Sequence, residues 1–214
     1  MSEIKGEERE KSLCLKDYLS DGYFSNRQWE SYLFQVKAVK KLINKGTVLE
    51  IGAGGGIINA VLKAIGFHAE TLDINKNLKP DYIASLSDAE YEPPKIFDCV
   101  LCAEVLEHIP FEKLHVCLQN ICKTTRQYAV ITLPNCLSAK YKFGIRINRH
   151  YKEAAFGLRK NNIAPMHFWE LNSTACCTNK KMTKYLNQYF KIIEENMIMK
   201  NPYHYYYILE KKHG

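Results

Sequence analysis

The segment Val48-Leu-Glu-Ile-Gly-Ala-Gly-Gly-Gly56 decides the fold of this 214-residue chain. Residues 47–51 form a short apolar and β-branched run that is typical of a buried strand. The mostly apolar residues 57–65, which end at Gly66, predict a helix. The sequence therefore predicts a strand, a glycine-rich turn and a helix in succession, an arrangement in which backbone N–H groups can approach a ligand closely.

Strands and helices alternate on both sides of this segment. Periodic apolar residues predict helices over 29–43, from near Phe111, and over 174–189. Apolar runs predict four further strands, over 67–73, 82–85, 97–102 and 128–133. Two last strands, over 191–197 and 203–211, are predicted to form an antiparallel hairpin. This alternation predicts an α/β fold with a doubly wound sheet, which binds ligands at the carboxyl ends of its strands.

The composition fits one globular domain. Hydrophobic residues make up 46% of the chain and charged residues 25%, which excludes disordered and fibrous classes. We predict a single domain over 29–214, preceded by an N-terminal arm or lid over 1–28. No apolar run approaches the roughly 18 residues that span a bilayer, and the N-terminus is charged, so we expect a cytoplasmic protein without a membrane span.

The eight cysteines are interpreted as intracellular thiols. Cys99 and Cys102 lie in a predicted strand, where an offset of three places their side chains on opposite faces. Cys117 and Cys122 are five residues apart on a predicted helix and do not share a face either. We therefore predict small buried side chains and no metal site.

The net charge of +7 is concentrated in one segment. Residues 138–166 contain seven Lys or Arg residues and one Glu, and so carry +6 of this charge. In this basic insertion, over about 138–170, Arg149 and Tyr151 are candidates for binding an anionic ligand such as a phosphate or a carboxylate. A solvated amphipathic helix is the structural alternative. RNA is an alternative partner because basic and aromatic residues interleave, although no known RNA-binding module accompanies them.

The glycine loop favours a nucleoside without phosphates. A dinucleotide-binding pattern would have glycine at position 57, where this chain has Ile57, and no G-K-[ST] follows the glycines. Asp73 ends the second predicted strand 21 residues after Gly52, and its two oxygens match the two hydroxyl donors of a ribose. The structural alternative is that Asp73 caps a turn before Asn75.

Three stretches carry a family pattern. Residues 48–56 contain E-x-G-x-G-x-G, residues 71–73 read Thr-Leu-Asp, and residues 97–108 read FDCVLCAEVLEH, which matches F-D-x-V-x-x-x-E-V-L-E-H. With these motifs the chain resembles the small-molecule branch of the class I S-adenosylmethionine-dependent methyltransferases. The resemblance covers roughly residues 48–133. It implies a Rossmann-like, doubly wound sheet of seven strands, mostly parallel with an antiparallel C-terminal hairpin.

The resemblance also implies a cofactor site. S-adenosylmethionine would bind with its methionine part at the glycine loop and its ribose at Asp73, and would leave as S-adenosylhomocysteine. Adenine would lie at the end of the third strand, where Ser85 stands in place of an acid that many relatives have. The implied cofactor-binding residues are Glu50, Gly52, Ala53, Gly54, Gly56, Asp73, Ile74, Ser85, Leu86, Cys102, Ala103 and Glu104.

Fewer residues can be assigned from the sequence to the part of the site that would bind the methyl acceptor. His108 and His167 are the catalytic candidates, because histidine can take up a proton near neutral pH. The alternatives are a structural role for His108 and an aromatic core contact for His167. Glu104 either contacts the ligands or begins a helix. Tyr23 and Asn135 are candidate wall residues, with a surface aromatic as the alternative for Tyr23.

The leading hypothesis is an enzyme that transfers a methyl group from S-adenosylmethionine to oxygen or nitrogen of a small metabolite, anionic if the basic insertion contacts it. Two alternatives stay open, namely methylation of RNA or protein, and a non-catalytic cofactor-binding module that serves interactions. The sequence specifies neither the acceptor nor the general base nor the oligomeric state.

Overall fold

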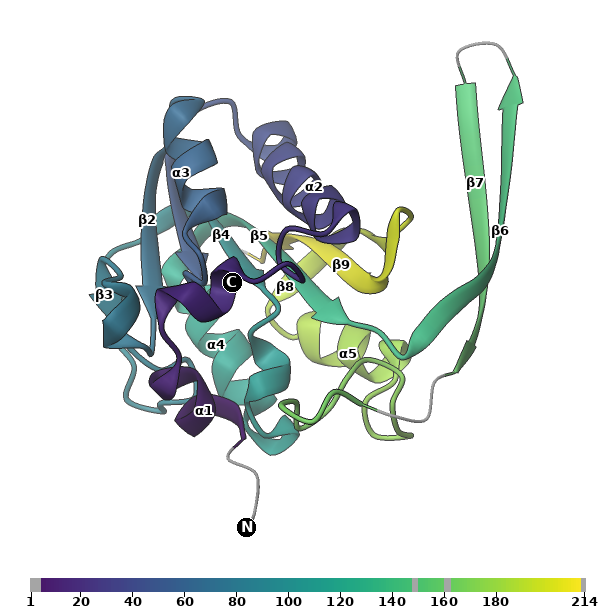
Figure 1. The fold of residues 1–214 in the computed structure, drawn as a ribbon. Helices are drawn as coiled ribbons and strands as arrows, with labels where there is room; N and C mark the ends of the chain where they lie inside the picture. The colour runs from purple at the N-terminus through teal and green to yellow at the C-terminus, as the bar shows by residue number, and fades with distance from the viewer. Residues whose placement is uncertain (1–4, 148–149, 160–162, 213–214) are drawn as a thin grey trace.

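A seven-stranded mixed sheet forms the centre of the protein (Figure 1). The computed structural model describes the backbone of residues 5–147, 150–159 and 163–212, and the side chains of these residues outside 138–162. The strands of the sheet, in the order β3-β2-β1-β4-β5-β9-β8, are β1 Thr47–Ile51, β2 His68–Asp73, β3 Tyr82–Ile83, β4 Phe97–Ala103, β5 Thr125–Pro134, β8 Phe190–Ile198 and β9 Asn201–Lys211.

The first five strands are parallel, and β9 runs antiparallel to both of its neighbours. This confirms the predicted fold class. The C-terminal hairpin places β9 beside β5, so that residues from the end of the chain reach the carboxyl end of the parallel strands, where Pro134 pairs with His204.

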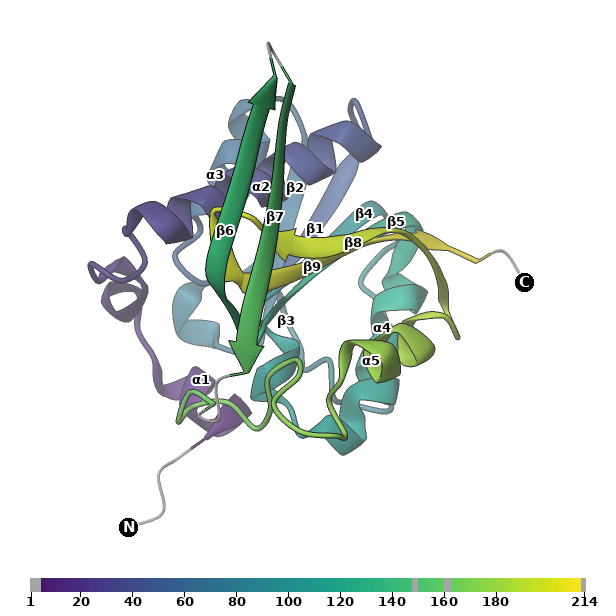
Figure 2. The same ribbon diagram turned by 90° about the vertical axis from the view of Figure 1, so that its right-hand side faces the viewer.

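Helices cover both faces of the sheet (Figure 2). One face carries α2 (Asn26–Leu42) and α3 (Ile57–Ala64), and the other carries α4 (Leu114–Thr124) and α5 (Asn179–Leu186). Each face has its own buried cluster of apolar side chains. Apart from Asp98, β4 is apolar because Cys99 and Leu101 pack into one cluster while Val100 and Cys102 pack into the other. Cys99 and Cys102 therefore lie on opposite faces, as predicted.

The helix predicted over 174–189 begins later than expected. Residues 174–178 precede it, and Thr178 is its N-cap, with a side chain that accepts a hydrogen bond from the backbone N–H of Lys181. The helix near Phe111 begins with a single 3₁₀ turn, Phe111–Lys113, before α4. Another short turn, Leu106–His108, follows β4.

The basic insertion is a β-hairpin, and the alternative of an amphipathic helix is wrong. Strands β6 (Leu137–Ile147) and β7 (His150–Arg159) pair antiparallel and project from the body of the protein (Figures 1 and 2). The reason is in the sequence, because apolar residues recur at every second position from Tyr141 to Ile147, which is the period of a strand.

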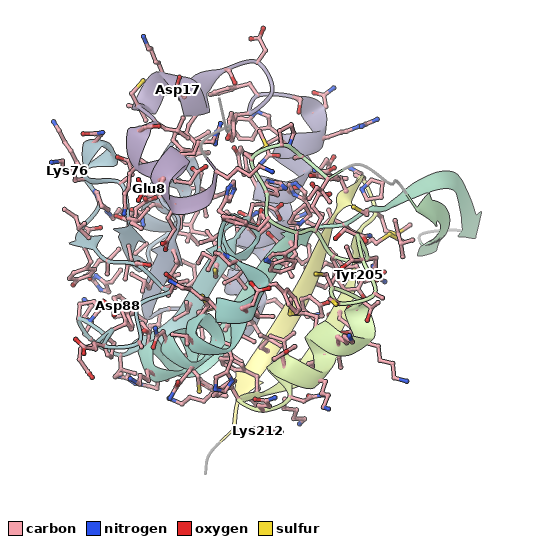
Figure 3. All side chains as sticks on the ribbon, turned by 90° about the horizontal axis from the view of Figure 1, so that it is seen from below. Glu8, Asp17, Lys76, Asp88, Tyr205 and Lys212 are labelled. Carbon is pink, nitrogen blue, oxygen red and sulfur yellow. The ribbon has the colours of Figure 1, made fainter. Side chains whose placement is uncertain are left out.

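The N-terminal arm contains ordered structure. Helix α1 (Gly6–Ser12) and a 3₁₀ helix, Leu15–Leu19, precede α2. The side-chain amide of Asn75, in the loop after β2, donates to the carbonyl oxygens of Glu10 (2.7 Å) and Leu13 (2.8 Å). Figure 3 shows the segment that carries Glu8 and Asp17 beside the loop that carries Lys76. The arm therefore lies at the carboxyl ends of the central strands. Among the described residues, none of the helices has the length and apolarity needed to cross a bilayer.

Candidate functional site

A cavity of about 310 Å³ lies at the carboxyl ends of β1, β2 and β4. Strand β1 lies between β2 and β4, so the chain crosses from one side of β1 to the other at this place. Such a switch point leaves a crevice between the loops that follow the two strands. The arm closes one side of the cavity through Glu7, Glu10 and Tyr18.

The glycine loop has backbone angles that a residue with a side chain could adopt only with strain. Gly52 has a φ of +85°, and a Cβ atom there would lie 2.4 Å from Cγ2 of Val105. Gly56, with a φ of +72°, is the N-cap of α3. Residues with a side chain rarely adopt these angles, so glycine is required for the turn to pass so close to β4. The turn thereby presents its backbone to the cavity.

Asp73 ends β2 and faces the loop. Its Oδ2 accepts a hydrogen bond from the N–H of Ala53 and its Oδ1 one from the N–H of Asn75, each at 2.8 Å. Burial raises the pKa of Asp73, and these hydrogen bonds offset part of that shift. Each oxygen keeps a lone pair for a ligand. Asp73 therefore caps the turn at Asn75, which is the structural alternative given above, and it also lines the cavity.

Glu50 lies deeper, on β1. Its carboxyl group is buried, Oε2 has no hydrogen-bond partner, and burial raises the pKa of Glu50 to about 8. A ligand with a positive charge or a proton donor would satisfy this group.

The third strand end forms another part of the wall. Leu86 is 2% exposed and lines the cavity with Ile74 and Ser85. The hydroxyl of Ser85 donates a short hydrogen bond to Oε1 of Glu7, and the hydroxyl of Ser87 donates to Oε2 of Glu7 at 3.3 Å. A carboxylate from the arm therefore stands beside the position where the sequence has serine and not an acid.

The opposite end of the cavity contains a cluster of carboxyl and imidazole groups. Glu104, directly after β4, has a φ of +55°, which is rare for a residue with a side chain. Its N–H donates to the carbonyl oxygen of Thr132 at 3.1 Å, and its Oε1 accepts from the Thr132 hydroxyl at 2.8 Å. Two bonds to β5 thus hold the strained residue, with Oε2 3.5 Å from Nε2 of His204. Strain of this kind is concentrated at functional sites.

Glu107 and His108 follow in the 3₁₀ turn after β4. Glu107 is fully buried, and neither of its carboxyl oxygens has a hydrogen-bond partner. Burial and the neighbouring Glu104 raise the pKa of Glu107. Burial and the neighbouring His167 lower the pKa of His108 to about 3, so its imidazole is neutral near pH 7.

His167 is oriented by Glu170. Nδ1 of His167 lies 2.9 Å from Oε1 of Glu170. Burial alone would raise the pKa of Glu170, but hydrogen bonds from His167, the N–H of Ala164, Tyr203 and Cys136 outweigh it and lower the pKa to about 2. An ionised Glu170 favours a proton on Nδ1 of His167, which leaves the lone pair on Nε2.

Four residues of this cluster were not predicted from the sequence, namely Glu107, Glu170, Tyr203 and His204. Glu170 stands three residues after His167, a spacing that would have suggested a pair. Tyr203 and His204 carry no local signal, because the pairing of β9 with β5 brings them to the site.

Most of the predicted residues line the cavity. These are Glu50, Gly52, Ala53, Gly54, Gly56, Asp73, Ile74, Ser85, Leu86, Ala103, Glu104, His108, His167 and Tyr23. Cys102 and Asn135 are not among the residues that line it, so their assignment to the site stays a prediction. Cys102 points into the core on one face of β4, and the side chain of Asn135 bonds the chain at Leu137 and Asn172. Arg149 lies outside the described residues, and Tyr151 lies on β7, where no side chain is described.

The strand order and the site define a class I S-adenosylmethionine-dependent methyltransferase. Residues 25–176 match a family model described as a methyltransferase domain, which covers well over half of the chain. The chain belongs to this methyltransferase family.

Curated relatives are ubiquinone biosynthesis O-methyltransferases. The protein of Rickettsia typhi is 30% identical over 118 residues, which are 48% of this chain and 47% of that protein. The protein of Xylella fastidiosa is 31% identical over 77 residues, 29% of this chain and 31% of that protein. The chain thus spans about half the length, or less, of these relatives.

Solved structures share the fold at low sequence identity. The N-methyltransferase NodS of Bradyrhizobium japonicum, solved with S-adenosylhomocysteine, has a TM-score of 0.60 and 12% identity, with 97% of each chain covered. Magnesium protoporphyrin IX methyltransferase of Synechocystis, solved with S-adenosylmethionine, has a TM-score of 0.56 and 14% identity, with 94% of this chain and 99% of that chain covered.

Proposed function

We propose that this protein transfers the methyl group of S-adenosylmethionine to a hydroxyl oxygen of a small molecule. The observation that carries the proposal is a single cavity with two unlike ends. One end has the glycine loop and Asp73, and the other has the histidine and carboxyl cluster at Glu104, His108 and His167. The first end suits an adenosyl cofactor, and the second suits an acceptor that must lose a proton.

At the donor end, the backbone of Gly52 to Gly56 would lie against the methionine part of the cofactor. Asp73 would accept hydrogen bonds from the ribose hydroxyls with its two remaining lone pairs. Glu50 would lie below the loop, and Ala103 and Glu104 would flank the sulfonium end. Ile74 and Leu86 would provide apolar contacts for the adenine ring.

Glu7 would supply an acceptor for the adenine amine. An acid at this place usually comes from the end of the third strand, where this chain has Ser85. Ser85 and Ser87 instead donate to Glu7 and hold its carboxylate at the cavity. Together with Tyr18, whose hydroxyl donates to Glu10 at 2.8 Å, this contact would make the arm a lid over the bound cofactor.

The reaction is an in-line displacement. The acceptor oxygen forms a bond to the methyl carbon while the bond between that carbon and the sulfonium sulfur breaks, which leaves S-adenosylhomocysteine. The protein contributes alignment of the two reactants and exclusion of water. The hydroxyl proton must leave at the acceptor end, where His108 and His167 are the candidate groups.

Oxygen is favoured over nitrogen as the methylated atom because the relatives at 28% to 31% identity are named O-methyltransferases. A small acceptor is favoured because the cavity of about 310 Å³ is at the lower end of the usual size of small-molecule sites, about 300–1,000 Å³, and has to hold the cofactor as well. Methylation of RNA or protein, and a non-catalytic role, stay predictions of the sequence that no described contact supports.

Calorimetric titration with S-adenosylhomocysteine tests the proposal. Asp73→Ala should weaken binding by about 100-fold or more, because two hydrogen bonds to a charged group contribute about 1.5–3 kcal/mol each. Asp21→Ala, which removes an exposed carboxylate from the arm, is the matched control and should leave the affinity unchanged. Equal affinity of the Asp73 variant and the wild type would refute the cofactor site.

A further inference from the structure

Three side chains with metal-binding groups converge at the acceptor end. Glu107, His108 and His167 each offer one ligand atom, and these atoms all lie within 4.8 Å of one another. The imidazole rings of His108 and His167 have centroids 4.8 Å apart and are almost perpendicular, at 89°. Two histidines and a carboxylate, from the 3₁₀ turn after β4 and from the 163–171 region, thus lie close together.

Glu107 provides the independent sign that a ligand is expected there. It is fully buried, and both of its oxygens lack a hydrogen-bond partner. A buried carboxyl group without a partner costs about 1–3 kcal/mol or more, and such groups are rare in folded proteins. Nδ1 of His108 is likewise buried without a hydrogen-bond partner; Oε1 of Glu10, at 3.4 Å, is within ion-pair distance only.

The surroundings have an excess of carboxyl groups. Oε1 of Glu10 lies 3.4 Å from Nδ1 of His108 and Oε1 of Glu170 lies 2.9 Å from Nδ1 of His167, and Glu104 lines the same cavity. Among the described residues that line the cavity, Arg9 is the single Lys or Arg, and it forms an ion pair with Glu10 at 2.7 Å. A cation would therefore be attracted to this end of the cavity.

Glu170 completes a second layer of contacts. Its bond to Nδ1 of His167 leaves Nε2 of that ring available for a ligand, and Glu170 is itself held by Tyr203 (2.7 Å) and by the N–H of Ala164 (2.9 Å). Histidines that bind metals commonly donate their other ring N–H to a carboxylate, which fixes the tautomer and the ring orientation.

We propose that Glu107, His108 and His167 bind a divalent transition-metal ion, which revises the sequence-based expectation of a protein without metal. A cation with bonds of about 2.0–2.2 Å holds neighbouring ligand atoms roughly 3–4 Å apart. Side-chain movements of less than about 1 Å would bring the present spacing within this range. Two imidazole nitrogens favour ions such as Fe²⁺ or Zn²⁺ over Mg²⁺, which prefers oxygen ligands, and the carboxylate is a ligand that Mn²⁺ also accepts.

The role of this cation rests on the proposed methyl transfer. Three protein ligands leave coordination positions open toward the cavity. A cation held there would supply Lewis-acid chemistry, because it would lower the pKa of an acceptor hydroxyl and favour the loss of its proton to solvent before the oxygen attacks the methyl carbon. His108 and His167 then serve as ligands, and neither needs to receive the proton.

Titration of chelator-treated protein with Mn²⁺, followed by calorimetry and by the loss of the free-ion electron paramagnetic resonance signal, tests the site. Mn²⁺ is the probe because the eight cysteine thiols compete weakly for it. We expect one ion per chain in the wild type. Glu107→Gln and His108→Asn should each weaken binding at least 10-fold. Glu112→Gln and His115→Asn, which change exposed residues nearby, are the matched controls and should bind as the wild type does.

Titration of each variant with S-adenosylhomocysteine separates the two proposals. Retained cofactor affinity shows that a variant is folded, so a loss of Mn²⁺ binding in such a variant supports the metal site. Wild-type protein that binds S-adenosylhomocysteine but not Mn²⁺, or equal Mn²⁺ affinity in the wild type and both site variants, overturns the metal site. A protein that binds Mn²⁺ but not the cofactor would refute the proposed function and leave the cation site standing.

Discussion

The two ends of the cavity differ in the groups that line them, backbone groups at the donor end and side chains at the acceptor end. The donor end is contiguous, since β1, its turn and β2 lie within 27 residues, and backbone groups make much of its surface. The acceptor end joins side chains from the segment after β4, from β9 and from the 163–171 region. A backbone site tolerates few substitutions at its glycines, whereas a side-chain site depends on each functional group. The two ends should therefore respond to mutation in separable ways.

The largest effect is expected at the glycine loop. Gly52→Ala should weaken S-adenosylhomocysteine binding by about 100-fold and lower the free energy of unfolding by about 1–3 kcal/mol, because the new Cβ meets Val105 and the φ is unfavourable. Gly22→Ala is the control, since no atom lies within 4 Å of the Cβ it would add. Calorimetry and urea unfolding measure both quantities. Wild-type affinity in Gly52→Ala would contradict the idea of a backbone-built donor end.

A substitution at the acceptor end should lower kcat without weakening the binding of the cofactor. Glu170→Gln removes the carboxylate that orients His167, and we expect a fall in kcat of about 10- to 100-fold. The dissociation constant for S-adenosylhomocysteine should change less than about twofold, because Glu170 does not line the cavity. Transfer of labelled methyl groups to catechol and phenol acceptors measures kcat, and Glu90→Gln, on the surface, is the control. Equal losses of kcat and affinity would argue that the two ends are one unit.

The pH dependence of stability should also differ between the ends. The raised pKa of Glu50, about 8, means that the folded protein holds a proton that the unfolded chain releases above its ordinary pKa of 4.5. The stabilising effect of Glu50 is therefore complete below about pH 4.5 and is lost as the pH rises to 8. His204, with a pKa lowered to about 4 by burial, acts in the opposite sense, because stability is lost as the pH falls below 6.5.

Urea unfolding at pH 6, 7 and 8 checks this difference. Glu50→Gln should gain about 2 kcal/mol relative to the wild type between pH 6 and 8, since one pKa unit corresponds to 1.36 kcal/mol. His204→Asn should show no such trend above pH 7. A constant difference between Glu50→Gln and the wild type would mean that the carboxyl group is already ionised at pH 6.

The smallest effect concerns the adenine contact. Glu7→Gln should reduce the preference for S-adenosylhomocysteine over S-inosylhomocysteine, which has an oxygen in place of the amine, by about 5- to 10-fold. Glu8→Gln, on the exposed side of α1 with a side chain 79% exposed, should not change the preference. Competition binding with the two nucleosides measures it. An unchanged preference in Glu7→Gln would place the amine contact elsewhere.

The sequence was most informative where the residues of the site are close together along the chain. The order of apolar runs predicted the seven-stranded sheet, and the spacing from Gly52 to Asp73 predicted the donor end, because a strand, a turn and the next strand are near neighbours in any doubly wound sheet. It did not reveal which face of β4 meets a ligand, because apolar side chains occupy both faces of that strand. It also left the basic insertion open, although the alternation around Phe143 indicated a strand.

By itself, the sequence determined the fold class, the family and the half of the cavity that lies against the glycine loop. Only the tertiary structure decided the other half. The pairing of β9 with β5 brings His204 to Glu104, and the return of the chain after the hairpin sets His167 against His108. These residues are 59 to 100 positions apart. Contacts over such distances arise from the packing of the whole domain, and no local pattern of residues encodes them.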